Sequence, residues 1–182
     1  MSIVLMEASD MRRTLGRLAH EILEANNGAE DLAVLGILQR GWPIAKRLAF
    51  VMTQIEGTTV PCAKLDARPF RDDRGPRVIP ATQVDESEIP FDLNGKKVVL
   101  VDEVIFTGRT VRAALDATMF HGRPKEVQLA VLIDRGHREL PIAPNFCGRV
   151  ISTDRTDHVS VLVNEYDDED KVILQKTESS IR

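Results

Sequence analysis

The segment VVLVDEVIFTGRT, residues 98–110, combines residue types that can bind a phosphate and a sugar. Its aliphatic residues end in two acids, Asp102 and Glu103, and a short loop leads to TGRT at residues 107–110, where a predicted helix begins. Free amides at a helix amino terminus, the positive end of the helix dipole and two threonine hydroxyls form a cradle for phosphate. Gly108 lets the backbone approach a ligand closely.

The two acids beside this cradle suit another part of the ligand, because like charges repel and a carboxylate does not bind phosphate. Asp102 and Glu103 can accept hydrogen bonds from the vicinal hydroxyls of a ribose, or interact with magnesium directly or through water. A phosphate site beside a diol site describes a ribose 5-phosphate. The alternative is an ordinary α/β turn whose acids cap the next helix. Neither the GK[ST] of a Walker loop nor the GxGxxG of a dinucleotide fingerprint occurs in this segment.

Strand and helix patterns alternate through the middle of the chain, as in proteins built on a parallel sheet. Apolar runs and helical periodicity predict strands at residues 32–38, 60–65, 97–101 and 127–133 and helices at residues 9–25, 43–56 and 110–121. Alternating segments at residues 148–151, 159–164 and 171–175 are typical of antiparallel edge strands. We therefore expect an α/β fold whose central, mostly parallel sheet is flanked by helices.

Ligands of such sheets bind beyond the carboxyl ends of the strands. Three turns follow apolar strands, namely Gln39-Arg40-Gly41, residues 102–110 and Asp134-Arg135-Gly136-His137, and we expect them to converge on one mouth. Residues 66–91 are instead rich in proline and charge and predict a long irregular excursion or an extended hairpin. Loops of that length in a compact domain are usually functional or mobile.

Length and composition narrow the class of protein. At 182 residues, with 43% hydrophobic and 29% charged residues, we expect one domain with a sizeable core. The formal net charge of −4 argues against a uniformly basic coat, although a local basic face is compatible with it. Cys62 and Cys147 lack metal-binding spacing and predict reduced thiols of a cytoplasmic protein. Short apolar runs and the lack of a signal pattern predict no membrane association.

The string at residues 98–110 resembles the motif with which type I phosphoribosyltransferases bind 5-phosphoribosyl-1-pyrophosphate (PRPP). The resemblance continues in MRRTLGRLAHEILEANNG, ILQRG, FRDD, GRPKEVQLAVLIDRGHRELPI and ISTDRTDHVSV, which look like successive parts of one family. That family comprises the pyrimidine operon attenuation regulators that are also uracil phosphoribosyltransferases. Apart from residues 74–88, the similarity covers nearly the whole chain.

This resemblance implies a type I phosphoribosyltransferase sheet over residues 1–182, with a small hood and a mobile active-site flap at residues 66–91. The implied reaction converts uracil and PRPP into UMP and pyrophosphate, with magnesium bound through PRPP and optionally by Asp102 or Glu103. These acids are the implied catalytic residues, because they can stabilise a ribosyl centre that becomes cationic. The implied PRPP-binding residues are Gln39, Arg40, Gly41, Arg77, Asp102, Glu103, Val104, Ile105, Phe106, Thr107, Gly108, Arg109 and Thr110.

The family likewise implies that Ile133, Asp134, Arg135 and His137 lie beside the nucleobase. The sequence also departs from the usual family pattern. Glu103 stands where an aspartate is usual, a glutamine begins the QRG turn where a threonine is usual, and DARPFRDD replaces the common DITLYRDD.

A second implied activity is binding of the leader messenger RNA of a pyrimidine operon, with termination promoted by UMP. Arg13, Arg17 and His20 lie at i, i+4 and i+7 and form one stripe on the first predicted helix, which Arg138 can join. Gly16 lies in this stripe where the family often has a hydroxyl residue. The alternative is a solvated helix surface. We expect a homodimer or larger homo-oligomer, which would concentrate the basic stripe for recognition of an RNA loop or bulge.

Two functions of other classes remain open from the sequence. One is an RNA-binding regulator that uses PRPP and UMP only as effectors, with vestigial catalysis. The other is a purine salvage phosphoribosyltransferase without RNA binding, and the string IDRGHREL argues against it.

Overall fold

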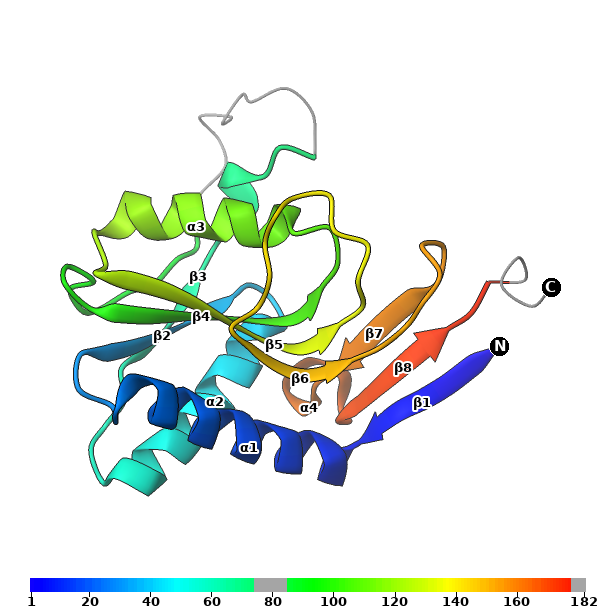
Figure 1. The fold of residues 1–182 in the computed structure, drawn as a ribbon, viewed down its shortest axis with the longest axis horizontal. Helices are drawn as coiled ribbons and strands as arrows, with labels where there is room; N and C mark the ends of the chain where they lie inside the picture. Colours follow the sequence, from blue (N-terminus) through cyan, green and yellow to red (C-terminus); the bar gives the residue numbers. More distant parts are fainter. Residues whose placement is uncertain (74–84, 178–182) are drawn as a thin grey trace.

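The computed structural model describes residues 1–73 and 85–177 (Figure 1). Its main sheet contains five strands in the order β3-β2-β4-β5-β6, and every neighbouring pair is parallel. The strands are β2 (Leu32–Ile37), β3 (Cys62–Leu65), β4 (Lys97–Ile105), β5 (Glu126–Asp134) and β6 (Phe146–Val150). The expected central parallel sheet is therefore confirmed.

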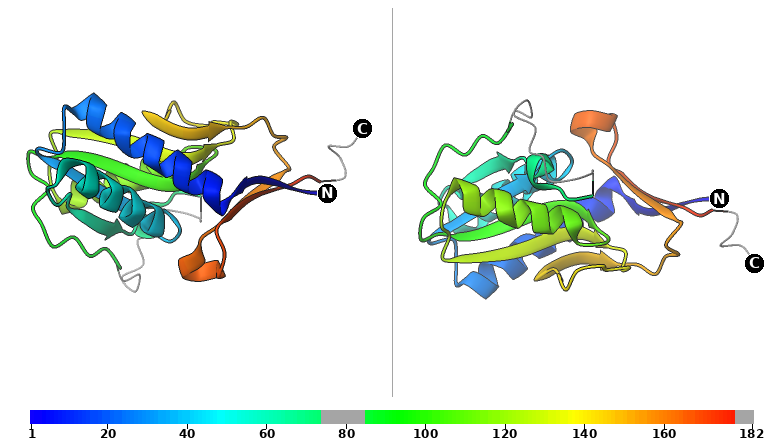
Figure 2. Two further views of the ribbon diagram at one scale, coloured as in Figure 1. Left: turned by 90° about the horizontal axis from the view of Figure 1, so that it is seen from below. Right: turned by 90° about the horizontal axis from the view of Figure 1, so that it is seen from above.

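Helices cover both faces of this sheet (Figure 2). Helices α1 (Ala8–Asn26) and α2 (Gly41–Glu56) pack on one face, and α3 (Arg109–His121) packs on the other. Successive side chains of a strand point to opposite faces. Accordingly, Val99 and Val101 belong to the core under α1 and α2, whereas Val98 and Leu100 belong to the core under α3. Burial on both faces explains why this strand is a continuous apolar run.

A smaller antiparallel sheet forms a hood at one end of the main sheet (Figures 1 and 2). Its strands, in the order β1-β8-β7, are β1 (Ser2–Glu7), β8 (Lys171–Gln175) and β7 (His158–Leu162). The short helix α4 (Asn164–Asp167) joins β7 to β8. Pairing of β1 with β8 brings the two ends of the described chain side by side. The hood lies over the carboxyl ends of the parallel strands.

Two expectations about strands were wrong. Residues 148–151 were expected as an antiparallel edge strand, but β6 runs parallel to β5. β6 is the edge strand of the main sheet, and its side chains pass from buried at Phe146 to exposed at Arg149 and Val150. Strand β1 was not predicted, since its partner β8 lies at the other end of the sequence. The acids of the central motif also lie inside β4, which extends to Ile105 rather than ending at residue 101.

Candidate active site at the ends of β2, β4 and β5

Asp102 and Glu103 lie near the carboxyl end of β4. Asp102 is buried, whereas Glu103 is half-buried. Asp102 Oδ1 accepts a hydrogen bond from the backbone N–H of Glu103 at 3.0 Å. Burial first, and then the charge of Glu103, raise the pKa of Asp102 well above its usual range. The hydrogen bond from Glu103 N–H and the charge of Arg71 favour the ionised form but do not outweigh these effects, and a cationic ligand would stabilise that form further.

The predicted phosphate cradle, residues 107–110, follows β4 and leads into α3. Gly108 precedes α3 with a φ of +91°, in the left-handed region that favours glycine. Thr107 Oγ1 accepts a hydrogen bond from the backbone N–H of Arg109 at 3.4 Å. A cleft of about 360 Å³ opens here, and it is lined by residues 104–111 together with Arg71, Asp73, Asp102 and Glu139. The cradle and the buried acid thus share one cleft.

The turn after β2 packs tightly against the same acid. A Cβ atom added to Gly41 would lie 2.5 Å from the carbonyl oxygen of Val101 and 3.2 Å from the Cα of Asp102, so only glycine fits. The preceding peptide bond between Leu38 and Gln39 is cis. Arg40 lines a second cleft of about 340 Å³ with Glu103, Val104 and residues 158–162 of β7. Two of the three expected turns therefore meet at Asp102 and Glu103.

The turn after β5 contacts the connection after β4 at the ring of Phe106. The guanidinium of Arg135 lies 4.1 Å from the centroid of the Phe106 ring, and the His137 ring meets this ring edge-on at 5.8 Å. His137 Nε2 is also 2.8 Å from the carbonyl oxygen of Thr153. Asp134 Oδ1 accepts a hydrogen bond from the backbone N–H of Gly136 at 2.9 Å, which closes the turn. The backbone N–H of Arg135 also donates a hydrogen bond of 3.2 Å to the carbonyl oxygen of Ile105, so this turn lies directly beside the segment that forms the phosphate cradle.

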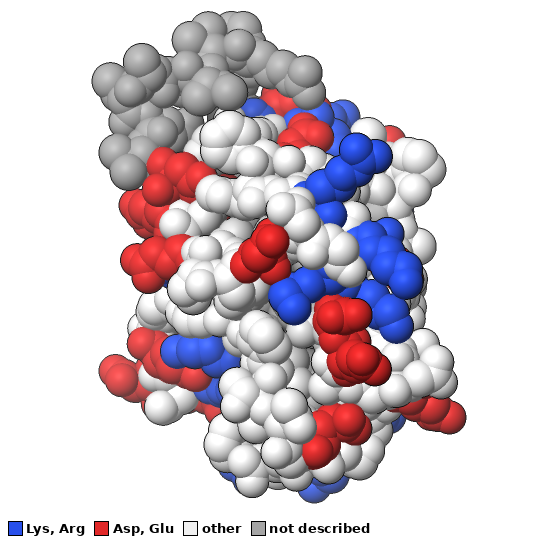
Figure 3. Space-filling view, turned by 90° about the vertical axis from the view of Figure 1, so that its left-hand side faces the viewer, with Lys and Arg blue, Asp and Glu red and all other residues white. Residues whose placement is uncertain are grey.

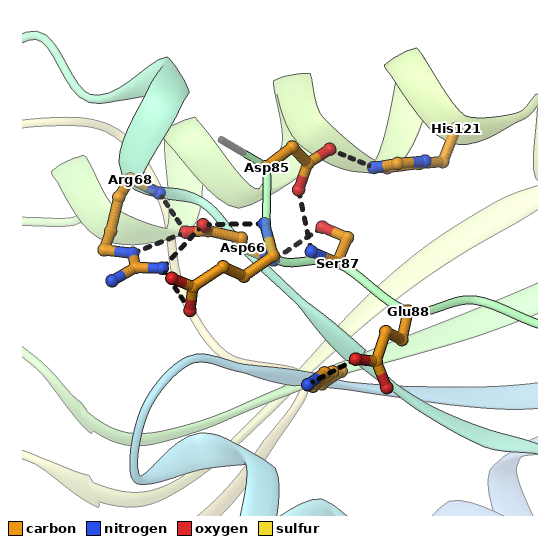
Figure 4. Close-up of polar contacts among 8 residues, drawn as sticks. Asp66, Arg68, Asp85, Ser87, Glu88 and His121 are labelled. Carbon is orange, nitrogen blue, oxygen red and sulfur yellow. Dashed lines mark hydrogen bonds and ion pairs between the residues drawn. The ribbon is translucent and has the colours of Figure 1, made fainter. Parts of the chain in front are cut away.

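Side chains that follow β3 form hydrogen bonds with one another in the irregular segment at residues 66–91 (Figure 4). The buried carboxylate of Asp66 accepts two hydrogen bonds of 2.8 Å from the Arg68 guanidinium and one of 3.2 Å from the backbone N–H of Glu86. Beside it, His121 of α3 lies 2.9 Å from Asp85. Both described ends of the segment are thereby fixed to the sheet and to α3.

Comparisons with known proteins agree with this geometry. The phosphoribosyl transferase domain family matches residues 6–167. The "Bifunctional protein PyrR" of Thermus thermophilus is 52% identical over 176 residues, which are 97% of each chain. That of Caldicellulosiruptor bescii is 49% identical over 177 residues, again 97% of each chain. This chain belongs to the PyrR family.

Solved structures support the fold of this PyrR family member. A hypoxanthine phosphoribosyl transferase of Trypanosoma cruzi aligns with a TM-score of 0.71 at 14% identity, covering 98% of this chain and 93% of that chain. One from Staphylococcus aureus aligns with a TM-score of 0.69 at 14% identity, covering 98% and 94%. At such identity the likeness shows the type I phosphoribosyltransferase fold alone, so the base that the PyrR chain accepts is a separate question.

Four residues that were not selected from the sequence line the cradle cleft of this PyrR family member, namely Arg71, Asp73, Val111 and Glu139. Arg71 Nε pairs with Asp73 at 2.8 Å, and Arg109 Nε pairs with Glu139 at 2.8 Å. The FRDD string was the available signal for the first two. The surrounding segment has no periodicity, however, so side-chain directions could not be predicted there. The predicted PRPP contact Arg77 lies outside the described residues.

The four predicted nucleobase residues (Ile133, Asp134, Arg135 and His137) are absent from the linings of the two clefts described above. Ile133 is fully buried in β5, and Arg135 is buried as well. Because the backbone after β5 is adjacent to residues 104–107 through Phe106, we retain a nucleobase role for this turn as a prediction.

The four residues of the predicted basic stripe do not all lie on one element of this PyrR family member. Arg13, Arg17 and His20 are exposed on α1, and the Arg13 side chain is 73% exposed. Arg17 also donates hydrogen bonds to backbone carbonyls of β6. The guanidinium of Arg138 instead pairs with Asp134 at 2.6 Å and belongs to the turn after β5. Any RNA contact by Arg138 therefore competes with this internal pair.

Charge on the face drawn in Figure 3 is mixed, with acidic and basic side chains interspersed among uncharged ones. This face carries no uniform basic coat, as the net charge of −4 predicts. Among residues 1–73 and 85–177, no group of three or more His, Cys, Asp or Glu side chains could hold a metal ion. Within the same ranges, the helices are all too short or too polar to span a bilayer.

Proposed function

We propose that this PyrR family member transfers the 5-phosphoribosyl group of PRPP to uracil, forming UMP and pyrophosphate. The observation that carries the proposal is the cleft in which the cradle at Gly108 and Thr110 meets the buried Asp102. A ribose 5-phosphate requires this combination, because amides and hydroxyls bind its phosphate and carboxylates bind its diol. Identity of about 50% to bifunctional PyrR proteins over nearly the whole chain favours uracil over purines.

The chemistry follows from charge development at the sugar. The bond from C1 of the ribose to the pyrophosphate oxygen breaks, and a bond from C1 to a uracil nitrogen forms. That nitrogen loses its proton to the departing pyrophosphate or to water. Positive charge grows on the ribosyl centre between these events. Ionised Asp102 and Glu103 at the end of β4 stabilise that charge, and their fixed positions require no reorganisation during the reaction. Alignment of the two substrates lowers the remaining barrier.

Magnesium carried with PRPP fits the donor set of the cleft. Asp102 and Glu103 offer the carboxylate oxygens that this ion prefers, and the raised pKa of Asp102 marks a place where positive charge is favoured. Asp102 and Glu103 would hold the ion together with the substrate, since the described residues form no group of three or more His, Cys, Asp or Glu side chains. The bound ion would supply neutralisation of the charge on departing pyrophosphate.

A base-competition assay tests the proposed reaction. Purified protein is incubated with PRPP, magnesium and labelled uracil, and UMP is separated by chromatography; guanine and hypoxanthine are then added in excess. We expect UMP formation that chelation of magnesium abolishes and that neither purine inhibits strongly. Nucleotide formation from a purine but not from uracil would establish the salvage alternative. PRPP and UMP binding without any transfer would establish a regulator with vestigial catalysis.

We propose leader-RNA binding as the second function. The supporting observation is the exposed stripe of Arg13, Arg17 and His20 on α1, which lies outside both clefts. Phosphate contacts by such side chains release counterions, so binding should weaken as salt rises. UMP should tighten RNA binding, and RNA should tighten UMP binding by the same factor, because coupling between two sites is reciprocal.

Gel-shift titration with the pyrimidine leader of the same genome tests this function. We expect Arg13→Gln and Arg17→Gln to weaken RNA binding without slowing UMP formation. Arg12→Gln, which removes the same charge from an exposed neighbour outside the stripe, is the matched control. Wild-type protein that binds the leader no better than an unrelated hairpin would remove the RNA function and leave the transferase proposal intact.

A further inference from the structure

Arg40, in the turn after β2, is held by the hood. Its Nε lies 3.2 Å from Asp167 Oδ2 and its Nη2 lies 2.7 Å from Asp167 Oδ1, which makes a two-point ion pair. Asp167 ends α4 and also accepts a hydrogen bond of 2.9 Å from the backbone N–H of Val163. Its side chain is only 17% exposed, so this carboxylate is fixed from two sides.

The geometry of the pair leaves part of the guanidinium available. A guanidinium has five N–H groups in a rigid fork. The edge formed by Nε and Nη2 is occupied by Asp167, while Nη1 has no hydrogen bond among the described residues. The Arg40 side chain is 37% exposed and lines the cleft that Glu103 and β7 also line. One edge of Arg40 is therefore anchored and the other can bind an anion in this cleft.

We propose that Asp167 is a positioning residue that orients Arg40 toward the pyrophosphate of PRPP, so that the hood forms part of the pyrophosphate site. This inference rests on the proposed function. An arginine whose fork is already fixed loses less conformational entropy when it binds an anion. The acidic partner keeps the guanidinium in one orientation and adds little repulsion, because the pyrophosphate would approach from the opposite edge.

A second ion pair between the hood and α2 provides a control. It distinguishes positioning of Arg40 from mere attachment of the hood. Arg47 of α2 binds Asp170 at 2.8 Å, and Asp170 accepts a hydrogen bond of 2.9 Å from the backbone N–H of Asn164. The Asp170 side chain is 16% exposed, which nearly equals the value for Asp167. This pair fastens the hood to α2 without lining either cleft. Asp170→Asn is therefore a matched control for Asp167→Asn.

The test measures steady-state kinetics and pyrophosphate binding in both variants. We expect Asp167→Asn to raise the KM for PRPP and to weaken pyrophosphate binding by calorimetry, each by about tenfold, with kcat and the KM for uracil changed less than about twofold. Asparagine keeps an oxygen for the Val163 N–H, so the hood turn should survive. Asp170→Asn should leave the KM for PRPP unchanged.

A double-mutant cycle with Arg40→Gln decides whether Asp167 acts through Arg40. We expect Asp167→Asn to cause no further rise in the KM for PRPP once Arg40 is replaced. An unchanged KM in Asp167→Asn, an equal rise in Asp170→Asn, or full additivity in the double variant would each overturn the inference. If Asp167→Asn is unstable, Asp167→Glu gives a second test, because its extra methylene moves the carboxylate and disturbs the two-point pair while Arg40 is unchanged. Wild-type protein without UMP formation would refute the proposed reaction, and the calorimetric comparison would still decide the role of Asp167.

Discussion

Asp66 and Asp102 lie at the carboxyl ends of β3 and β4 in the same sheet, and both are buried. Burial by itself would raise the pKa of Asp66, but hydrogen bonds from the Arg68 side chain and from the backbone N–H groups of Arg68 and Glu86 lower it below its usual value. Asp102 has no such donor set, and burial together with the charge of Glu103 raises its pKa. Two aspartates with similar burial thus have opposite electrostatics.

The difference separates an anchor from a binding site. Asp66 uses its charge inside the protein, where it fixes both described ends of the irregular segment. The charge of Asp102 is only partly compensated inside the protein, by Glu103 N–H and Arg71, and a cationic ribosyl centre or a magnesium ion beside the cradle would compensate it further. Strongly perturbed carboxyl groups in a cleft are a recognised mark of functional sites.

The largest expected effect comes from neutralising the acids of β4. The double variant Asp102→Asn with Glu103→Gln should lower UMP formation by at least about 100-fold, because the charge stabilisation of the ribosyl centre is lost. Its melting temperature should equal or exceed that of the wild type, since repulsion between the two acids is removed. Activity assays and calorimetric melting measure both. Retention of more than about a tenth of the activity would contradict the assignment.

The corresponding change at β3 should act on stability. Asp66→Asn removes the partner of Arg68 and should lower the free energy of unfolding by about 1–3 kcal/mol, measured by urea denaturation. Asp168→Asn, an exposed carboxylate in the hood, is the control and should change it by less than about 0.5 kcal/mol. Equal stability of Asp66→Asn and wild type would show that Asp66 is no anchor.

The cradle after β4 should respond through substrate affinity. Replacing Thr107 and Thr110 by valine preserves volume and removes two hydroxyls, so the KM for PRPP should rise by about tenfold while the KM for uracil stays constant. The paired change of Thr58 and Thr59 to valine on an exposed turn is the control. An unchanged KM for PRPP would mean that the phosphate lies elsewhere.

The smallest expected effect is in the pH dependence of melting. Because the pKa of Asp102 in the folded protein is raised, the contribution of this residue to stability falls as pH rises from about 4 through that raised value. The melting temperature of Asp102→Asn should therefore gain about 3 °C relative to wild type between pH 4 and 7. The folded pKa of Asp66 is lowered, so its stabilisation is present above about pH 4 and disappears as the solution becomes more acidic. Asp66→Asn should therefore approach wild type at low pH. Parallel profiles for both variants would contradict the opposite pKa directions.

The sequence by itself predicted the sheet, which the structure confirms, and the central site, whose role stays a prediction. Buried parallel strands require continuous apolar runs, and the run before Asp102 ends where ligands of such sheets bind, so local pattern was sufficient. The segment 98–110 also contains all the chemical groups of its cradle within one strand-to-helix connection. The glycine at 108 was predicted from its place before the helix, and its positive φ agrees with that prediction. The close approach of Gly41 to Val101 and Asp102 was found only in the structure.

Tertiary structure alone decided which charges neutralise one another. Arg40 and Asp167 are 127 positions apart, and Arg109 and Glu139 are 30 apart, so nothing in their local patterns indicates the pairs. The direction of β6 depended on the path of a loop without periodicity, and β1 depended on a partner at the opposite end of the chain. Local patterns report which face of an element is buried. The pKa of a carboxyl group instead depends on the donors and charges that folding brings within a few ångströms, which is why Asp66 and Asp102 could be told apart only in three dimensions.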